Sequence, residues 1–183
     1  MTTTEPRRRG ISIYRAADAP DLQDTDLMSS PAMDDDTRAH FGEVIAAGAG
    51  AGATVKVLVR QDMDEGGFSL VYLWFKPHYP LPRHTHDTDC LYYVISGTAV
   101  MGSQTLRAGD SFFVPCDAPY QYSAGPEGVE VLEIRHGADR FDMKIPGAGA
   151  ERWRAMLGAT EANVDGWRAA GASPMFAANT AGG

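Results

Sequence analysis

The middle of the chain is a series of short segments in which apolar residues alternate with polar ones or form continuous runs. Residues 53–60 alternate, residues 68–75 are almost entirely apolar, and residues 64–67 between them have the composition of a turn. Further strands are predicted at 91–95, 99–101, 111–114, 120–123 and 129–135. Many short strands at regular spacing are typical of a sandwich or a barrel. We therefore predict an all-β domain over residues 53–145.

The N-terminal extension, residues 1–52, begins with a polar tail. The alternation at residues 11–14 predicts a short strand. An acidic stretch then offers an N-cap for a helix, whose apolar positions follow helical spacing at Phe41, Val44 and Ile45. Residues 46–53 form a glycine-alanine connector that we expect to be mobile.

The C-terminal part, residues 146–183, departs from the strand pattern. One face of a short helix is predicted from the spacing of Trp153, Met156 and Leu157. Gly158 could end this helix. We expect a disordered tail at residues 172–183.

Composition agrees with one compact domain between these extensions. The chain has 183 residues, of which 44% are hydrophobic and 22% charged, and its net charge is −8. This charge argues against nucleic acid or an anionic membrane as a partner, and no apolar run has the length of a membrane span. Two cysteines outside any framework pattern are most simply explained by a cytoplasmic location. A homodimer is also compatible with the sequence, because residues 11–14 could pair with a second subunit.

Two histidines, His84 and His86, stand two positions apart just before the predicted strand at 91–95. In extended backbone such residues point to the same side, so their imidazoles can reach one point. An open transition-metal site normally has a third protein ligand, and Cys90 is the nearest candidate. The other candidates for completing the set are Asp87, Asp89, His78 and His136.

This segment resembles the first motif of the cupin superfamily, in which a leading glycine precedes a His-x-His pair, a glutamate and a closing glycine. His84, His86 and Gly97 match that motif. Cys90 stands where the glutamate is expected, and His78 stands at the leading glycine. The first motif is therefore present with an altered ligand set.

The second cupin motif is similar to residues 109–120. Gly109 and Pro115 match its glycine and proline. Asp117 replaces its second glycine, and Tyr120 replaces the last metal-binding histidine. Because the two motifs occur in order at the expected separation, the resemblance implies a cupin-type β-barrel or jelly roll over roughly residues 53–136. It also implies a divalent transition metal, with iron preferred and zinc next.

Strand alternation predicts which side chains face the barrel interior. If Cys90 faces inward, Tyr92 does so too, and Tyr120 and Tyr122 likewise share one side. Tyr120 and Tyr122 are the candidate catalytic acid–base residues. The candidate substrate-binding residues are Tyr92, Phe113 and Trp74. Such a cavity suits a small, partly apolar or aromatic molecule.

Three functions follow from these observations. The first is a metal-dependent cupin enzyme, with His84, His86 and Cys90 as metal ligands, acting as a non-haem iron oxygenase on a small molecule. No lysine or arginine cluster is predicted at the cavity, which speaks against a phosphorylated substrate. The second is a metal-dependent lyase or isomerase that uses a tyrosine as its acid–base. The third is a non-catalytic barrel that binds a small molecule, which the changes at Cys90 and Tyr120 would suit.

Overall fold

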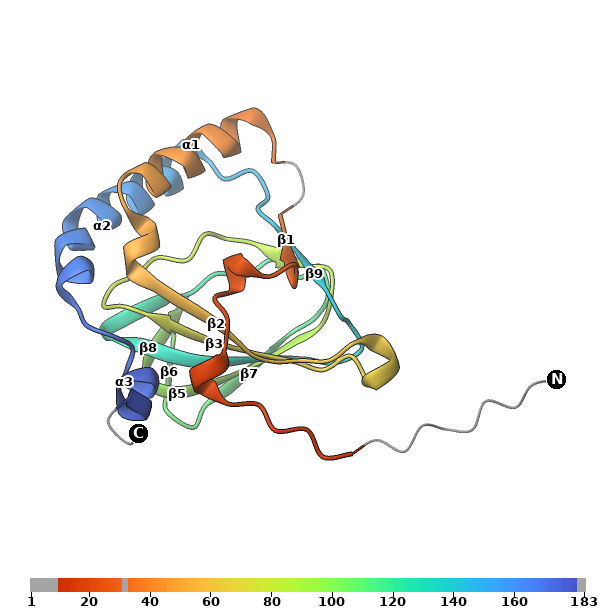
Figure 1. Ribbon diagram of the computed structural model, residues 1–183. Coiled ribbons are helices and arrows are strands. Elements are labelled where there is room, and N and C mark those ends of the chain that lie inside the picture. The colour runs from red at the N-terminus through yellow and green to blue at the C-terminus, as the bar shows by residue number, and fades with distance from the viewer. Residues whose placement is uncertain (1–9, 31–32, 181–183) are drawn as a thin grey trace.

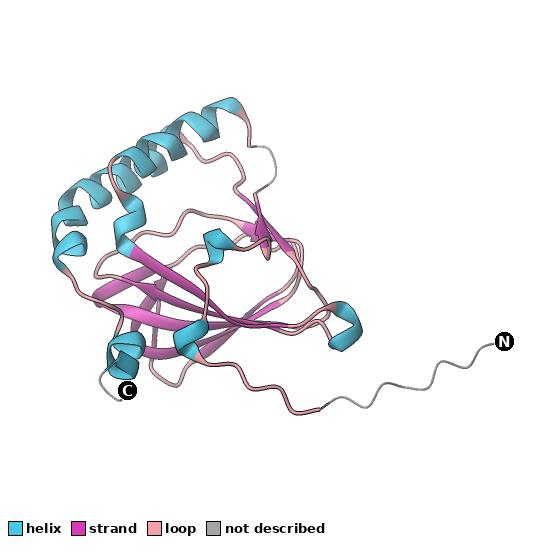
Figure 2. Cartoon of the chain, viewed as in Figure 1, coloured by secondary structure: helices cyan, strands magenta, loops and turns pink. Residues whose placement is uncertain are grey.

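The structure is a computed structural model that describes residues 10–30 and 33–180 (Figure 1). Within these residues a larger sheet has the strand order β2-β3-β8-β5-β6, with β7 paired to β5. Its strands are β2 (Ala53–Arg60), β3 (Ser69–Phe75), β5 (Cys90–Met101), β6 (Gln104–Arg107), β7 (Ser111–Val114) and β8 (Ser123–Arg135). A smaller sheet contains β1 (Met28–Ser29), β9 (Phe141–Lys144) and β4 (Thr85–His86) in that order. The strands curve into a barrel (Figure 2), which confirms the predicted all-β, cupin-type fold.

Alternation along β5 separates the barrel interior from its surface. Cys90, Tyr92 and Val94 are buried, whereas Leu91 and Tyr93 are exposed. The inward side chains belong to the main hydrophobic core together with apolar residues of β2, β3 and β8. The predicted orientation of this strand is therefore confirmed, and it directs a row of side chains toward the cavity described below.

The short strand β4 joins the histidine pair to the rest of the barrel. Its residues Thr85 and His86 pair with β9, and the preceding His84 forms an isolated antiparallel bridge with Tyr120. Across that bridge each backbone N–H donates to the other residue's carbonyl oxygen at 3.0 Å. The parts of the two motifs that carry His84, His86 and Tyr120 are thereby fixed next to each other.

Two helices, α1 (Asp35–Ala46) and α2 (Ala150–Ala169), pack together beside one end of the barrel (Figure 1). Helix α1 is N-capped by Asp34, whose carboxylate accepts the backbone N–H of Thr37 at 2.8 Å. Val44 of α1 and Trp153 of α2 are buried in a second apolar cluster. The helices therefore have their own small core at the barrel end.

None of the helices in the described residues is both long and apolar enough to cross a membrane.

The N-terminal extension differs from its prediction in two segments. Residues 11–14 do not form a strand. The apolar side chains of this segment cover no core, and Ile11 is 97% exposed. The connector at 46–53 contains the 3-10 helix η3 (Ala49–Gly52), in which Ala49 is buried and Gly52 lies against Tyr79 and Trp167. It is packed rather than mobile. Three more 3-10 helices are η1 (Ala16–Asp18), η2 (Leu22–Asp24) and η4 (Met63–Glu65).

The C-terminal part also contains more helix than predicted. Helix α2 continues through Gly158 to Ala169 because Thr160 and Trp167, beyond the glycine, are buried. Their burial outweighs the low helix propensity of one glycine. Residues Pro174–Thr180, expected to be disordered, form the short helix α3, and residues 181–183 lie outside the described residues.

The closing glycine of the first motif has a steric role. Gly97 has a φ of +69°, and a Cβ at this position would lie 2.1 Å from the carbonyl oxygen of Gly128. We expect Gly97→Ala to lower the free energy of unfolding by about 2–4 kcal/mol, measured by urea denaturation. The control is Gly158→Ala, where a Cβ meets nothing within 4 Å. This exposed position on α2 should gain up to about 1 kcal/mol. Equal stability of the two variants would contradict the close approach.

Candidate functional site

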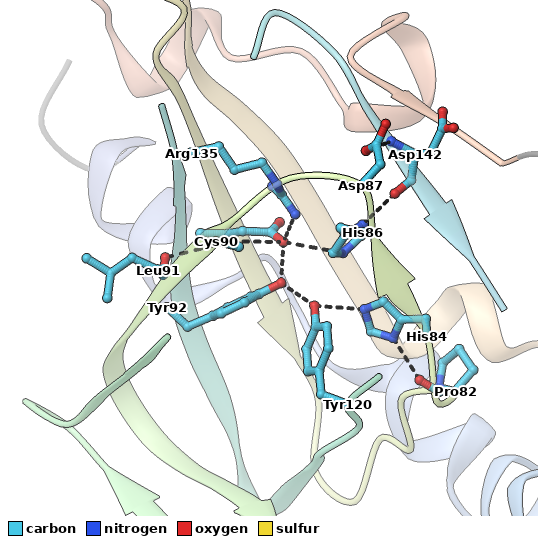
Figure 3. Close-up of polar contacts among 11 residues, drawn as sticks. Pro82, His84, His86, Asp87, Cys90, Leu91, Tyr92, Tyr120, Arg135 and Asp142 are labelled. Atoms are coloured by element: carbon cyan, nitrogen blue, oxygen red, sulfur yellow. Dashed lines mark hydrogen bonds and ion pairs between the residues drawn. The ribbon is translucent and has the colours of Figure 1, made fainter. Parts of the chain in front are cut away.

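Polar residues from separate parts of the chain meet inside the barrel. His84 and His86 come from β4 and the residue before it, Tyr120 from the loop before β8, Tyr92 from β5 and Glu133 from β8. Tyr92 and Glu133 are direct partners in the β5–β8 register, so their side chains leave the sheet at the same place. Figure 3 shows Tyr92, Tyr120 and the two imidazoles gathered around one point.

Both imidazoles are oriented by backbone carbonyl groups. Nδ1 of His84 lies 2.8 Å from the carbonyl oxygen of Pro82, and Nδ1 of His86 lies 2.8 Å from that of Asp142. Because a carbonyl oxygen only accepts, each Nδ1 carries the ring proton and each Nε2 is unprotonated. Burial lowers the pKa of His84 to about 4 and also lowers the pKa of His86. The two rings are therefore neutral near pH 7, in the tautomer that binds metals through Nε2.

A chain of hydrogen bonds leads from His84 to Glu133. The hydroxyl of Tyr120 donates to His84 Nε2 at 2.8 Å, and it also contacts the hydroxyl of Tyr92. The Tyr92 hydroxyl donates to Glu133 Oε1 at 2.5 Å. Burial raises the pKa of both phenols well above the ordinary value, so both tyrosines are neutral near pH 7.

Glu133 is an ionised carboxylate despite its burial. Burial alone would raise the pKa of its carboxyl group, but the charge and hydrogen bond of the Arg135 guanidinium outweigh this and bring that pKa to about 2. Arg135 is itself fully buried, with its guanidinium 3.5 Å from the centre of the Phe141 ring. The site therefore contains a desolvated ion pair directly beside the histidines.

The chain of hydrogen bonds from His84 to Glu133 has one proton fewer than it has contacts between polar atoms. Three contacts separate His84 Nε2 from ionised Glu133, and only the phenolic protons of Tyr120 and Tyr92 are available to fill them. In addition, His86 Nε2 faces Glu133 Oε1 at 3.8 Å, which sets a lone pair against an anionic oxygen. A cation bound to the two Nε2 atoms and to Glu133 would remove both the proton deficit and the repulsion between His86 Nε2 and Glu133. With His84 Nε2 engaged in this way, the two phenolic protons suffice for the two remaining contacts.

The residues present therefore fit a metal ion by their donor chemistry. Two neutral imidazoles and one carboxylate are ordinary ligands of iron and zinc. As the side chains lie, no group of three or more His, Cys, Asp or Glu in the described part of the chain forms a ready metal-binding shell. The hydroxyl of Tyr120 is bonded to His84 Nε2, and Tyr92 and Arg135 engage the Glu133 carboxylate. Binding of an ion would exchange the Tyr120 hydrogen bond for a metal bond.

A cavity of about 180 Å³ adjoins this polar cluster. His84, His86 and Glu133 line it, as do four tyrosines, Tyr79, Tyr92, Tyr120 and Tyr122. The rest of its wall is apolar and includes side chains of β2, β3, α1 and α2, among them Leu73, Phe75, Val44 and Met156. The cavity thus combines a polar end with an apolar body, as small-molecule sites commonly do.

Cys90, the predicted third ligand, lies beside the cluster without lining the cavity. Its Sγ donates weakly to Glu133 Oε1 at 3.7 Å. Burial raises the pKa of this thiol well above the ordinary value. Cys90 is therefore a neutral thiol that supports the carboxylate, and Glu133 presents the acidic group that the first motif lacks.

Two predicted substrate-binding residues point elsewhere. Phe113 is 58% exposed because it pairs with Leu91, which faces outward on β5. Its neighbour Phe112 faces inward and stacks on Tyr92, with ring centroids 4.5 Å apart. Trp74 lies on the outer face of β3, between the cavity-lining Leu73 and Phe75. Neither side chain lines the cavity, because each lies on the outer face of its strand.

Neither of the two spare histidines lines the cavity. His78 is exposed, with a left-handed φ of 62°. His136 is exposed and packs against Phe68 with the two rings tilted, at a centroid distance of 4.5 Å. Sequence reasoning missed Glu133 and Arg135 as site residues. Their positions in the sequence could have indicated this, because both share the inward face of β8 with Val129 and Val131. Charged residues on a buried face are uncommon unless they are paired or functional.

Comparisons with known proteins relate the chain to others by fold. No protein-family model matches the sequence, and no curated protein matches it. Among solved structures, a cupin-like protein from Thermotoga maritima MSB8 shares 19% identity, with 57% of this chain and 84% of that one aligned at a TM-score of 0.48. An RmlC-like cupin from Shewanella frigidimarina NCIMB 400 shares 24% identity over 48% of this chain and 78% of that chain, at a TM-score of 0.40.

A third similar structure is the polyketide cyclase RemF from Streptomyces resistomycificus, with 17% identity. The alignment covers 62% of this chain and 84% of that one, at a TM-score of 0.46. The strand order and the two motifs of the sequence agree with the cupin-type barrel that the sequence predicts. The likeness is one of fold.

Proposed function

We propose that this chain is an enzyme that binds a divalent transition metal through His84, His86 and Glu133 and acts on a small molecule in the adjoining cavity. The observation that carries this proposal is the meeting of two unprotonated Nε2 atoms and one carboxylate oxygen at the polar end of an apolar cavity. Two histidines and one carboxylate with open positions are the ligand set of non-haem iron oxygenases. Oxygenation is therefore the favoured chemistry, with iron the first choice of metal and zinc the next.

A bound ion would polarise a substrate oxygen or, as iron, support dioxygen chemistry. The protein's own contribution is to hold the reacting groups in place. The carbonyl groups of Pro82 and Asp142 orient the imidazoles, and Arg135 keeps Glu133 ionised. Tyr120, a neutral phenol, can donate a proton at its hydroxyl oxygen. The apolar wall excludes water from the substrate.

The test is the elemental metal content of protein purified without chelators or a metal-affinity column. We expect near-stoichiometric iron or zinc in the wild type and its loss in His86→Ala, because two ligands hold a transition metal far more weakly than three. The matched control is His136→Ala, which removes an exposed histidine and should retain the metal. Cys90→Ala should also retain it. Loss of metal in Cys90→Ala with retention in Glu133→Gln would assign the third position to the thiolate and overturn this ligand set.

A second candidate within the same site is a lyase or isomerase that uses Tyr120 as its acid. The hydrogen bond from the Tyr120 hydroxyl to His84, and the continuation to Tyr92 and Glu133, favour it because they form a path for a proton. A non-catalytic binding protein would be supported instead by wild-type protein that contains no metal and takes up none after anaerobic addition of iron.

A further inference from the structure

A second hollow, a groove of about 350 Å³, lies between the barrel and helix α2. One side is formed by the segment Pro80–Arg83 and the other by the first turns of α2, including Arg152 and Met156. The groove and the cavity of the candidate site share four lining residues, Leu81, Pro82, Tyr122 and Met156. The two hollows therefore adjoin, and one ligand could extend from the groove toward the metal-binding residues.

The groove is positive in a protein that is negative as a whole. Its charged lining residues are Arg83 and Arg152, and no acidic residue lines it within the described part of the chain. Neither guanidinium has an ion-pair partner among the described residues. The two arginines lie far apart in the sequence, so their position in one groove is not apparent from the sequence. Unpaired guanidinium groups beside apolar walls are suited to an oxyanion.

Two buried donors in the groove also lack acceptors. Trp153 and Tyr122 both line the groove and are only 3% exposed. Neither Nε1 of Trp153 nor the hydroxyl of Tyr122 has a hydrogen-bond partner. A buried donor without a partner is unusual in a native protein and calls for an explanation. Both donor atoms are shielded from solvent, so an acceptor on a ligand in the groove would reach them only if these side chains moved.

We propose that this groove binds the carboxylate of the substrate, whose apolar body extends into the cavity of the candidate site. This inference rests on the proposed function, and it names the substrate class as an organic acid with an apolar body. The guanidinium groups of Arg83 and Arg152 hold the carboxylate. Tyr122 lines both hollows and so lies where they adjoin.

Binding of phenylalkanoates tests the proposal. The probes are a panel from phenylacetate to 6-phenylhexanoate, each with its uncharged primary amide, titrated into the full-length chain by calorimetry at low ionic strength. The proteins are the wild type, Arg83→Met and Arg152→Met. The matched control is Arg154→Met, an exposed arginine on the same helix that does not line the groove. We expect at least one acid to bind the wild type and Arg154→Met about tenfold more tightly than its amide.

The preference for the acid should disappear in Arg83→Met and in Arg152→Met. Equal affinity of acid and amide in the wild type, preference that survives in both groove variants, or no binding by any acid in the panel would overturn the proposal. The titrations are repeated with His86→Ala after chelator treatment. A preserved preference there locates acid recognition in the groove rather than at a metal. A failure of the metal-content test is thus distinguishable from a failure of this one.

Discussion

Replacing Arg135 by methionine is expected to lower the free energy of unfolding by about 3–5 kcal/mol, because it leaves the carboxylate of Glu133 buried without its counter-ion. Both side chains of this pair lie inside the barrel, where a charge without a partner is costly. The loss should decrease at acid pH, since Glu133 in the variant can take up a proton. Denaturation by guanidinium chloride after chelator treatment measures the effect without a contribution from metal.

The comparison variants are Glu133→Gln, the double variant with Arg135→Met, and Arg140→Met. Each buried single change orphans its partner, so the double variant should cost at least about 2 kcal/mol less than the sum of the two singles. Arg140 makes an exposed ion pair with Asp26 at 2.7 Å, and its loss should cost less than about 1 kcal/mol. Additive single effects, or a cost at Arg135 as small as that at Arg140, would contradict a strongly coupled buried pair.

Local alternation is the part of the fold that the sequence predicts well. Along β5, Cys90, Tyr92 and Val94 face inward as expected, because a half-buried strand must repeat its apolar side every two residues. The two-residue strands β1 and β4 have no such repeat. Both strands pair with β9, which lies more than fifty residues away from β4 in the chain. No local pattern could have predicted them.

The candidate site shows the same division. His84 and His86 were predictable because their spacing and their chemistry belong to one short segment. Glu133 joins them only through the pairing of β8 with β5, which sets it opposite Tyr92. The error at Phe113 has a related cause, since the faces of β7 depend on which residue of β5 each one pairs with. Residue chemistry is local, whereas strand register is a property of the whole fold.

The buried histidine gives the metal-free protein an acid-sensitive stability. The pKa of His84 is about 4 in the folded chain, below its ordinary value of 6.5, so the unfolded state takes up a proton first as the pH falls. Stability should therefore decrease from about pH 6.5 down to pH 4, by up to about 3 kcal/mol from this residue. Glu133, with a pKa of about 2 against 4.5, adds a loss that begins below about pH 4.5.

Urea denaturation of chelator-treated protein between pH 7 and pH 4.5 separates these contributions, because only histidine protonation lowers the free energy of unfolding over most of that range. In His84→Gln the decrease in this window should be about half or less of that in the wild type, whereas His136→Gln, at an exposed position, should leave the wild-type slope intact. Wild-type protein whose stability is constant across this window would contradict a neutral, desolvated His84. Metal-loaded protein should lose stability more steeply over the same range, since protons compete with the metal for the imidazole nitrogens.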